Sequence, residues 1–443
     1  MRNTSSNSFL VSRAKGAFLG LALGDALGTS LEFKPPGSFE PITDMLGGGP
    51  FGLDAGQWTD DTSMALCLAD SLLARGKNDI DDQMVRYIRW ANNGENASTG
   101  TCFDIGNTIR QALDRYLATG KAKAGRDDEY SAGNGSLMRI APIALFYHSK
   151  SIPVLLKAAA DASMTTHAEP RCIQACQLYC YYLQRLLRSP ATPTKEALLF
   201  ELSKPMQVRT ENWHAQIKAI TEGCFIRKPV SQIRGRGFVV ESLEAALWCF
   251  WHSDSFEQGA LMAANFGDDA DTTAAIYGQL AGAYYGYQSL PQRWLDRLYW
   301  RANIEDLALM LVRYPSRQKL AKFVQFNQEW TETFSNYPRH SEQLVEHAIS
   351  MFFTSLSVYD ICIPDWDWMD WLDRNQLKQL SASQLRQWID RAGTGQLIAY
   401  LTMLVRSERF CHGTIAESIE QGTLQAVIAG LDEGPTNHEP VNG

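Results

Sequence analysis

Positive charge is scarce in this sequence. Its 443 residues carry 41 Lys and Arg against 49 Asp and Glu, a formal net charge of −8. A protein dedicated to nucleic acid needs a basic stripe that neutralises phosphates, and the sequence offers none. The charge balance therefore excludes a nucleic-acid partner and is neutral toward chemistry on small molecules.

Long uncharged apolar runs are also missing. The most apolar stretch, residues 16–31, contains Asp25 and many small residues, which favours a packed core helix over a membrane span. Residues 1–12 are polar and rich in Ser and Asn, and they lack the charged start and apolar core of a signal peptide. We therefore expect a soluble, cytoplasmic protein with no membrane partner.

Cysteines number nine and are scattered along the chain. Cys172, Cys176 and Cys180 recur every four residues, which places them on one face of a helix. Three thiolates stacked along one helix cannot easily close a tetrahedral metal site. The pattern therefore favours small buried hydrophobic residues in a reducing cytosol, with a metal–thiolate site as the alternative.

Strand-type alternation is nearly absent, and apolar residues recur instead with helical spacing. This pattern predicts an all-α fold with helices near residues 64–73, 84–90, 105–117, 154–163, 171–187, 243–251, 272–285 and 296–310, and further ones near 383–392, 397–406 and 415–431. The composition becomes more polar after about Val312. We predict a catalytic domain at residues 1–312, a small helical C-terminal extension at residues 313–443, and a disordered tail from Gly434.

An aromatic and acidic stretch stands out in the extension, where Trp366, Trp368 and Trp371 lie close together in the sequence. Clustered aromatic residues are typical of exposed protein-binding patches. They are also typical of packing surfaces, and here they could pack the extension onto the catalytic domain. We favour the packing interpretation.

Carboxylates and hydroxyls crowd two segments that each lead directly into an apolar helix. The segments are Trp58-Thr59-Asp60-Asp61-Thr62-Ser63 and Asn265-Phe266-Gly267-Asp268-Asp269-Ala270-Asp271-Thr272-Thr273. Helix capping would explain one acid in each segment. Adjacent carboxylates repel each other, however, so the additional acids favour a bound hard cation such as Mg²⁺ or Mn²⁺, which prefers oxygen ligands.

Glycine recurs every fourth residue at Gly16, Gly20, Gly24 and Gly28. Each glycine costs a helix about 1 kcal/mol relative to alanine, so a row on one face implies that something approaches closely. Close helix packing is the favoured reason, and close approach of a ligand is the alternative. Glu32 follows this apolar run, and we expect it to face inward.

Five short segments, taken in this order, resemble the ADP-ribosylglycohydrolase family, which includes the dinitrogenase reductase-activating glycohydrolases. They are Gly24-Asp25-Ala26-Leu27-Gly28 followed by Glu32-Phe33, then Trp58-Thr59-Asp60-Asp61-Thr62, Gly133-Asn134-Gly135-Ser136-Leu137-Met138-Arg139, Thr166-His167, and Gly267-Asp268-Asp269-Ala270-Asp271-Thr272. Any one segment is weak evidence. The ordered set spans most of residues 16–290 and is highly specific.

The resemblance implies an orthogonal bundle of many helices that holds two Mg²⁺ or Mn²⁺ ions. The metal ligands that it implies are Thr59, Asp60, Asp61, Asp269, Asp271 and Thr272. The family often has glycine where this chain has Asp268. We therefore interpret Asp268 as a residue outside the ligand set or as a helix cap.

Residues 133–139 form a glycine-rich segment that leads into an apolar helix. Glycines let backbone N–H groups approach an anion, and a helix N-terminus favours negative charge. The resemblance places the pyrophosphate and ribose of ADP-ribose near this segment, and a plain loop is the alternative. The substrate-binding residues that we predict are Asp104, Gly106, Asn134, Gly135, Ser136 and His167, although a lone histidine such as His167 could equally be structural.

The activity that the resemblance implies is hydrolysis of the bond between ADP-ribose and a protein side chain, most similar to the arginine-directed branch. We expect Asp60 or Asp61 to act as the base and Glu32 to orient water or assist the leaving group. The partner would be an ADP-ribosylated protein. The role would be regulatory, or immunity against an ADP-ribosylating toxin that could itself be bound. A catalytically silent protein that binds ADP-ribose or toxin is the alternative, and the intact acids argue against it.

Overall fold

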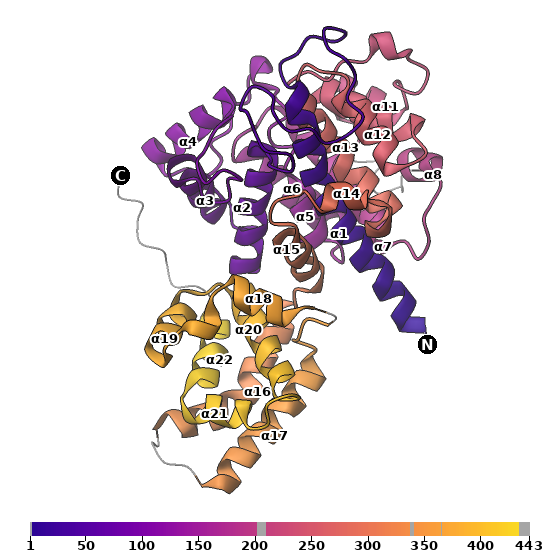
Figure 1. The fold of residues 1–443 in the computed structure, drawn as a ribbon. Helices are drawn as coiled ribbons and strands as arrows, with labels where there is room; N and C mark the ends of the chain where they lie inside the picture. Colours follow the sequence, from indigo (N-terminus) through magenta and orange to yellow (C-terminus); the bar gives the residue numbers. More distant parts are fainter. Residues whose placement is uncertain (1, 202–209, 337–340, 365, 434–443) are drawn as a thin grey trace. The chain divides into compact units, whose positions relative to one another are not determined.

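The structure, a computed structural model, describes residues 2–201, 210–336, 341–364 and 366–433. These residues form helices joined by loops, with isolated β-bridges but no β-strand among them (Figure 1). The prediction of an all-α fold is therefore confirmed. Within the same ranges, no helix has the length and apolarity that crossing a membrane requires. The tail from Gly434, predicted to be disordered, lies outside the described residues.

Contacts divide the chain into two compact units, residues 1–72 with 78–312 and residues 73–77 with 313–443. The helices of the first unit are α1 (Arg2–Gly28), α2 (Asp60–Arg75, whose last turn belongs to the second unit), α3 (Ile80–Asn93), α4 (Asn107–Thr119), α5 (Ala141–Phe146), α6 (Ile152–Met164), α7 (Pro170–Arg188), α8 (Lys195–Phe200), α10 (Ala215–Thr221), α11 (Val239–His252), α12 (Phe256–Ala264), α13 (Ala270–Tyr285), α14 (Gln292–Leu295) and α15 (Arg301–Arg313). Those of the second unit are α16 (Arg317–Asn336), α17 (Glu342–Tyr359), α18 (Trp368–Arg374), α19 (Ala382–Arg391), α20 (Thr394–Ser407), α21 (Thr414–Glu420) and α22 (Thr423–Glu433).

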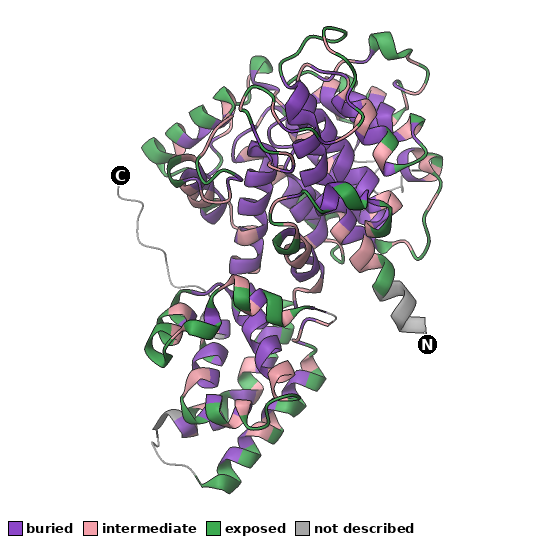
Figure 2. Cartoon of the chain, viewed as in Figure 1, coloured by how far each residue is buried: buried purple, intermediate pink, exposed green. Residues whose placement is uncertain are grey.

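Helices α1 and α13 form the core of the first unit. They run antiparallel, and both are buried over most of their described side chains (Figure 2). A Cβ atom added at any of the four α1 glycines would overlap a backbone carbonyl oxygen of α13, at Gly282, Gly278, Ala274 and Ala270 in turn. The fourfold glycine repeat is therefore explained by close helix packing, as predicted, and it brings the last turns of α1 against the start of α13.

Helix boundaries differ from the sequence-based expectation most clearly at three places. Helix α1 begins at Arg2 and thus includes most of the polar segment 1–12. The helix predicted at 296–310 begins only at Arg301, as α15, because Trp300 directly before it takes a positive φ of 47°. The helix predicted at 415–431 is interrupted by Gly422 at φ 73°, which separates α21 from α22. Residues in the left-handed region end a helix.

Of the three clustered tryptophans, Trp366 and Trp371 are packed in the core of the second unit, whereas Trp368 is only partly buried. Trp366 and Trp371 are each only 5% exposed, and their rings lie 5.2 Å apart. Trp388 extends the cluster, with its ring 6.4 Å from that of Trp371 and 5.8 Å from that of Tyr400. This burial supports packing over an exposed patch. The ring partners belong to the extension itself.

The three cysteines of α7 are all buried, with no exposed surface at Cys172, Cys176 or Cys180. Burial raises the pKa of each thiol, which keeps it protonated. Groups of acids, rather than these cysteines, form the possible cation sites among the described residues. The interpretation as small buried hydrophobic residues therefore fits the structure.

Candidate active site and metal centre

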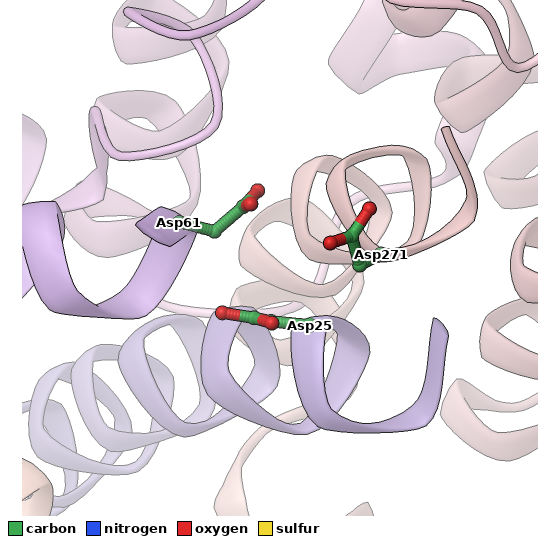
Figure 3. A group of neighbouring side chains, drawn as sticks. All are labelled: Asp25, Asp61 and Asp271. Atoms are coloured by element: carbon green, nitrogen blue, oxygen red, sulfur yellow. The ribbon is translucent and has the colours of Figure 1, made fainter. Parts of the chain in front are cut away.

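Three helix ends converge on one group of acids. Asp25 lies near the end of α1, Asp61 lies in the first turn of α2, and Asp271 lies in the first turn of α13. Their side chains point toward one another (Figure 3). One carboxylate oxygen from each lies within 4.8 Å of the other two. The antiparallel packing of α1 on α13 creates this meeting point, because it places Asp25 beside the start of α13.

Asp25 is fully buried and holds the start of α2 in place. Its two carboxylate oxygens accept hydrogen bonds from the backbone N–H groups of Thr59 and Thr62, at 2.9 and 3.0 Å, and from the hydroxyls of the same residues, at 2.9 and 2.7 Å. The side chain thus caps α2 from another helix. Local sequence patterns assigned no role to Asp25, because a cap supplied from 34 residues away leaves no local signal.

The carboxylate oxygens around Thr59 outnumber the hydrogen-bond donors available to them. Its Oγ1 lies 2.9 Å from Asp25 Oδ1, 3.1 Å from Asp271 Oδ2 and 3.4 Å from Asp61 Oδ2, but a hydroxyl has a single proton to donate. Asp61 Oδ1 is buried with no hydrogen-bond partner. Burial, followed by neighbouring carboxylates, raises the pKa of Asp61 well above its usual value. A hard cation among these oxygens would satisfy them all, so the donor set fits Mg²⁺ or Mn²⁺.

A second group of acids shares Asp271. One carboxylate oxygen each from Glu32, Asp104 and Asp271 lies within 4.8 Å of the others. Burial, and then the charges of Asp271 and Asp104, raise the pKa of Glu32 far above its usual value, and Glu32 Oε2 is buried without a partner. Burial, and then the charge of Asp269, raise the pKa of Asp104 to about 7. Glu32 therefore faces inward as expected, and this group also could hold a cation.

The adjacent residues Asp268 and Asp269 make different contacts. Asp269 stands at the N-cap position of α13 but makes no side-chain cap bond, and its Oδ2 accepts a hydrogen bond from Asn134 Nδ2 at 2.8 Å. Asp268 takes a positive φ of 55°, and its Oδ2 is paired with Arg234 Nη2 at 2.7 Å. The structure thus places Asp269 beside the acid groups, while Asp268 lies outside them and is not the cap of α13.

A cavity of about 250 Å³ opens onto these acids. Among the residues predicted for the site, its lining includes Glu32, Asp60, Asp104, Gly106, Asn134, Gly135, His167, Asp269, Asp271 and Thr272. Thr59 and Asp61 lie beneath the lining, buried and hydrogen-bonded to lining residues. Ser136 points elsewhere, since its buried hydroxyl is 2.9 Å from that of Ser163. The structure therefore brings together residues that are up to about 240 positions apart in the sequence.

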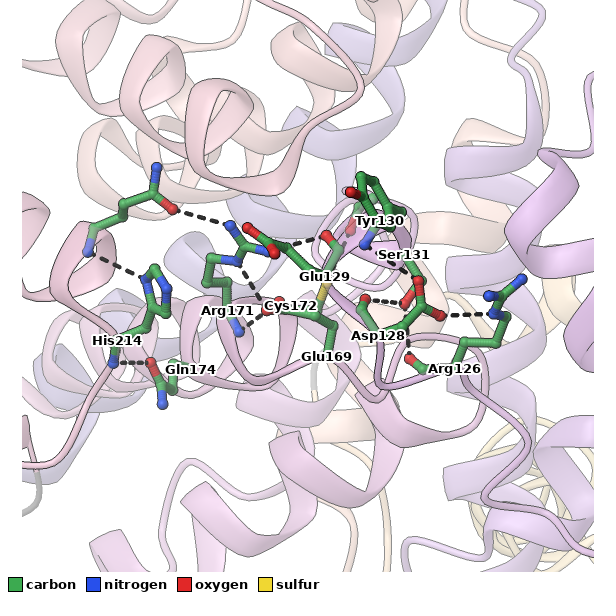
Figure 4. A network of polar contacts seen from close by, with 12 residues as sticks. Arg126, Asp128, Glu129, Tyr130, Ser131, Glu169, Arg171, Cys172, Gln174 and His214 are labelled. Carbon is green, nitrogen blue, oxygen red and sulfur yellow. Dashed lines mark hydrogen bonds and ion pairs between the residues drawn. The ribbon is translucent and has the colours of Figure 1, made fainter.

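The glycine-rich segment and the residues before it are hydrogen-bonded to α7 and to the segment before α11. Arg171 donates to the backbone oxygen of Glu129 at 3.0 Å and to the Glu169 carboxylate at 2.8 Å (Figure 4). Cys172 Sγ contacts the backbone oxygen of Gly133 at 3.2 Å, and Asn134 N donates to Gly237 O at 3.0 Å. These contacts hold one wall of the cavity. The sequence did not suggest Arg171, whose partners Glu129, Glu169 and Gln216 lie on three separate segments.

His167 is held by a buried relay. Arg139 Nη2 donates to Thr166 Oγ1 at 2.7 Å, so the Thr166 hydroxyl must use its proton elsewhere. Its other hydrogen-bonding neighbour is His167 Nδ1 at 2.8 Å, so we assign Nδ1 as the acceptor of that proton, with the ring proton on Nε2. Burial, and then the charge of Arg139, lower the pKa of His167 to about 3, so the ring stays neutral. A Cβ added at Gly133 would lie 3.1 Å from Nε2, which shows how closely the glycine segment follows the ring.

Comparison with known families matches both units of the chain. A model of the ADP-ribosylglycohydrolase family matches residues 6–320. A model of a family of unknown function matches residues 302–434. The first match includes every residue of the cavity and of both acid groups.

Individual relatives are similar over the same region. An ADP-ribosylarginine hydrolase, Tri1, of Serratia proteamaculans is 42% identical over 299 residues, which are 68% of this chain and 78% of the relative. The ADP-ribosyl-[dinitrogen reductase] glycohydrolase of Rhodospirillum rubrum is 32% identical over 66% of this chain and 92% of the relative. A solved structure described as an ADP-ribosylglycohydrolase-related protein complex is 44% identical, covers 69% of this chain and 99% of its own, and superposes with a TM-score of 0.60.

Proposed function

Because this chain belongs to the ADP-ribosylglycohydrolase family, we propose that it is an enzyme that removes ADP-ribose from arginine side chains of modified proteins. The observation that carries the proposal is the position of the acid-lined cavity, which lies wholly within the region matched by the family model. Two relatives named for hydrolysis on arginine or on a modified reductase match the same region. The complete set of acids argues against a catalytically silent binding protein.

We propose that two divalent cations, Mg²⁺ or Mn²⁺, bind among the acids at the starts of α2 and α13. Thr59, Asp60, Asp61, Asp269, Asp271 and Thr272 would hold them. Support comes from the crowded oxygens around Thr59 and from the partnerless Asp61 Oδ1. When bound, such cations neutralise the carboxylates and act as Lewis acids toward ribose oxygens.

Proton transfer is assigned to residues of the chain. Asp60 lines the cavity, whereas Asp61 lies beneath it, so Asp60 is the better placed of the two predicted bases to accept a proton from water. Glu32 also lines the cavity, and burial, followed by the charges of Asp271 and Asp104, raises the pKa of its carboxyl. A protonated Glu32 can donate a proton to the leaving nitrogen, as the acid partner of a glycosidase pair does.

The substrate would bind along the glycine segment. Asn134 and Gly135 line the cavity beside His167, whose Nε2–H is a neutral donor, and Asp104 and Gly106 line it as well. Ser136 stays in the proposed set through its backbone alone, because its hydroxyl is engaged in the core. Donors of this kind suit phosphate and ribose oxygens.

The two parts of the chain would have different roles. Residues 1–312 would form the catalytic domain and residues 313–443 the C-terminal extension, in a cytoplasmic protein. A regulatory role and an immunity role against an ADP-ribosylating toxin both stay predictions. In the second case, a cognate ADP-ribosyltransferase toxin would be a second partner.

Chelation of divalent metal is expected to abolish hydrolysis. The purified protein should release ADP-ribose from an ADP-ribosyl-arginine protein in Mg²⁺ or Mn²⁺, and EDTA should reduce that release to background, because the uncompensated acids would then repel one another. Release of labelled ADP-ribose measures the effect, and added Mg²⁺ or Mn²⁺ should restore it. Full activity after confirmed removal of metal would contradict the metal proposal.

The linkage itself is tested by supplying the same protein with arginine-linked and serine-linked ADP-ribose side by side. We expect release from the arginine-linked substrate. Release from serine alone would contradict the proposed substrate while leaving the reaction type intact. Binding of ADP-ribose with no release from either linkage would favour the catalytically silent alternative.

Substitution of Thr166 by valine is expected to let His167 populate both neutral tautomers. Valine has nearly the same shape but no hydroxyl, so Nδ1 loses its donor and the Nδ1–H form becomes populated. The wild-type ring should show protonated Nε2 throughout pH 5–8 by ¹⁵N NMR, because its pKa is lowered to about 3. The dissociation constant of ADP-ribose should rise roughly tenfold, the cost of one misdirected hydrogen bond.

Thr165 provides the matched control. It also accepts from Arg139 Nη2, at 3.1 Å, but its hydroxyl donates to Ala162 O at 2.7 Å instead of to His167. Thr165→Val should therefore leave the tautomer unchanged. If Thr166→Val and Thr165→Val give the same NMR spectrum for His167, the relay does not set the tautomer.

A further inference from the structure

Phe33 is held in an unusual conformation at the cavity. Its side chain is 64% exposed and its φ is 59°, a region that bulky residues rarely adopt. Backbone hydrogen bonds fix it there, from Phe33 N to Asp268 O at 2.7 Å and from Asp268 N to Lys34 O at 2.8 Å. An exposed aromatic ring on a constrained backbone is unfavourable for folding alone, so it calls for a functional explanation.

The ring is the exposed end of an aromatic row. The Phe33 and Phe51 ring centroids lie 6.4 Å apart in an edge-on arrangement, and Phe51 lies 5.1 Å from Phe103. The three rings come from separate segments of the chain. Phe33 itself lines the cavity, together with the neighbouring Glu32 and with Asp104, the residue after Phe103. An aromatic surface and carboxylates thus meet in one part of the cavity lining.

The negative charge in this part of the cavity determines which group of a ligand can bind there. Carboxylate oxygens of Glu32, Asp104 and Asp271 lie together here. Four more buried acids lie close enough for charges to act between them and this group: Asp25, Asp60, Asp61 and Asp269. Even two divalent cations would leave some of this negative charge uncompensated. A phosphate would be repelled, and it is better received by the backbone of the glycine segment and by the His167 Nε2–H. A cationic group is attracted both to carboxylates and to the face of an aromatic ring.

We propose that Phe33, beside Glu32 and Asp104, forms the subsite for the guanidinium group of the modified arginine. The inference rests on the proposed function and extends it to the leaving-group side of the substrate. A guanidinium group is planar, stacks on aromatic faces, and donates N–H groups to carboxylates. A serine-linked substrate has no cation to place there. Phe33 is therefore a specificity-determining residue for the arginine linkage.

The test compares Phe33→Gly with Phe33→Tyr in the full-length, metal-loaded protein. Glycine removes the ring and adopts a positive φ without steric strain, so this variant should melt at or above the wild-type temperature. Its KM for ADP-ribosyl-arginine should rise about tenfold, the size of one cation–aromatic contact. Its dissociation constant for free ADP-ribose, measured by calorimetry, should stay within about twofold of wild type. Phe33→Tyr keeps the ring and should retain the wild-type KM.

Each other outcome has a distinct meaning. An equal loss of affinity for ADP-ribose and for ADP-ribosyl-arginine would place Phe33 against the ADP-ribose portion and overturn the inference. An unchanged KM in Phe33→Gly would overturn it as well, while leaving the proposed function standing. If wild type releases nothing from ADP-ribosyl-arginine, the proposed function fails. Binding of the intact compound then decides the inference, according to whether Phe33→Gly weakens it about tenfold more than it weakens ADP-ribose binding.

Discussion

Asp271→Asn is expected to lower kcat on an ADP-ribosyl-arginine substrate by on the order of a thousandfold. Asp271 belongs to both groups of carboxylates that could hold a cation, and one of its oxygens lies 3.1 Å from Thr59 Oγ1. Asparagine keeps the size of the side chain but supplies a single neutral oxygen. Binding of the proposed cations should therefore weaken. Steady-state kinetics at saturating Mn²⁺, with calorimetric titration of Mn²⁺, measures the loss.

Asp268 is the matched control for this variant. It lies three residues earlier in the same acidic segment, but its carboxylate is paired with Arg234 at 2.7 Å and lies outside both acid groups. Asparagine tolerates the positive φ of 55° at this position, so Asp268→Asn should not strain the backbone. Its kcat should stay within a few-fold of wild type. Equal losses in the two variants would mean that negative charge in general, and not the position of Asp271, supports activity.

Stability of the metal-free protein should move in the opposite direction to activity. Burial, followed by neighbouring acids, raises the pKa of Asp271 well above that of an unfolded chain. The folded protein thus binds this proton more tightly, and the metal-free fold is destabilised as pH rises above about 4. Asparagine removes that penalty. In EDTA, Asp271→Asn should melt above wild type at pH 8, and the difference should narrow toward pH 4.

Local sequence patterns predicted the parts of the site that are local in the structure. Thr59, Asp60 and Asp61 stand immediately before or within the first turn of α2, and Asp269 and Asp271 stand in the same way at α13, as the two acidic segments indicated. Capping and helical periodicity act over a few residues, so the order of residues carries them. The positions of these segments relative to each other came from the family resemblance and not from periodicity.

Long-range contacts were the part that the sequence could not supply. Asp25 caps α2 across 34 residues, and Arg139 reaches Thr166 across 27 residues to orient His167. The positive φ of Phe33 depends on backbone hydrogen bonds from Phe33 to Asp268 and from Asp268 to Lys34. No residue pattern near Phe33 predicts them. The late start of α15 after Trp300 and the break at Gly422 were missed for a related reason, since apolar spacing continues across a left-handed residue.

Gly24→Ala is expected to destabilise the protein by about 3 kcal/mol or more, despite a gain of about 1 kcal/mol in helix propensity. A Cβ at Gly24 would overlap the backbone oxygen and carbon of Ala274 and would lie 2.7 Å from the nitrogen of Ala275. Backbone atoms of a packed helix cannot rotate away as a side-chain end can. Helices α1 and α13 must therefore separate, and Asp25 and Asp271 would separate with them. Activity should fall together with the melting temperature.

Gly430→Ala provides the comparison within a helix interior. There the added Cβ would meet Leu397 Cδ1 at 2.8 Å, the end of a flexible side chain that can change rotamer. Its cost should stay within about 1 kcal/mol, since the gain in helix propensity offsets the repacking. Thermal unfolding followed by circular dichroism, with hydrolysis assayed on the same samples, separates the two variants. A Gly24→Ala protein that melts at the wild-type temperature would show that α1 and α13 can move apart freely, and the glycine repeat would then need an explanation other than close packing.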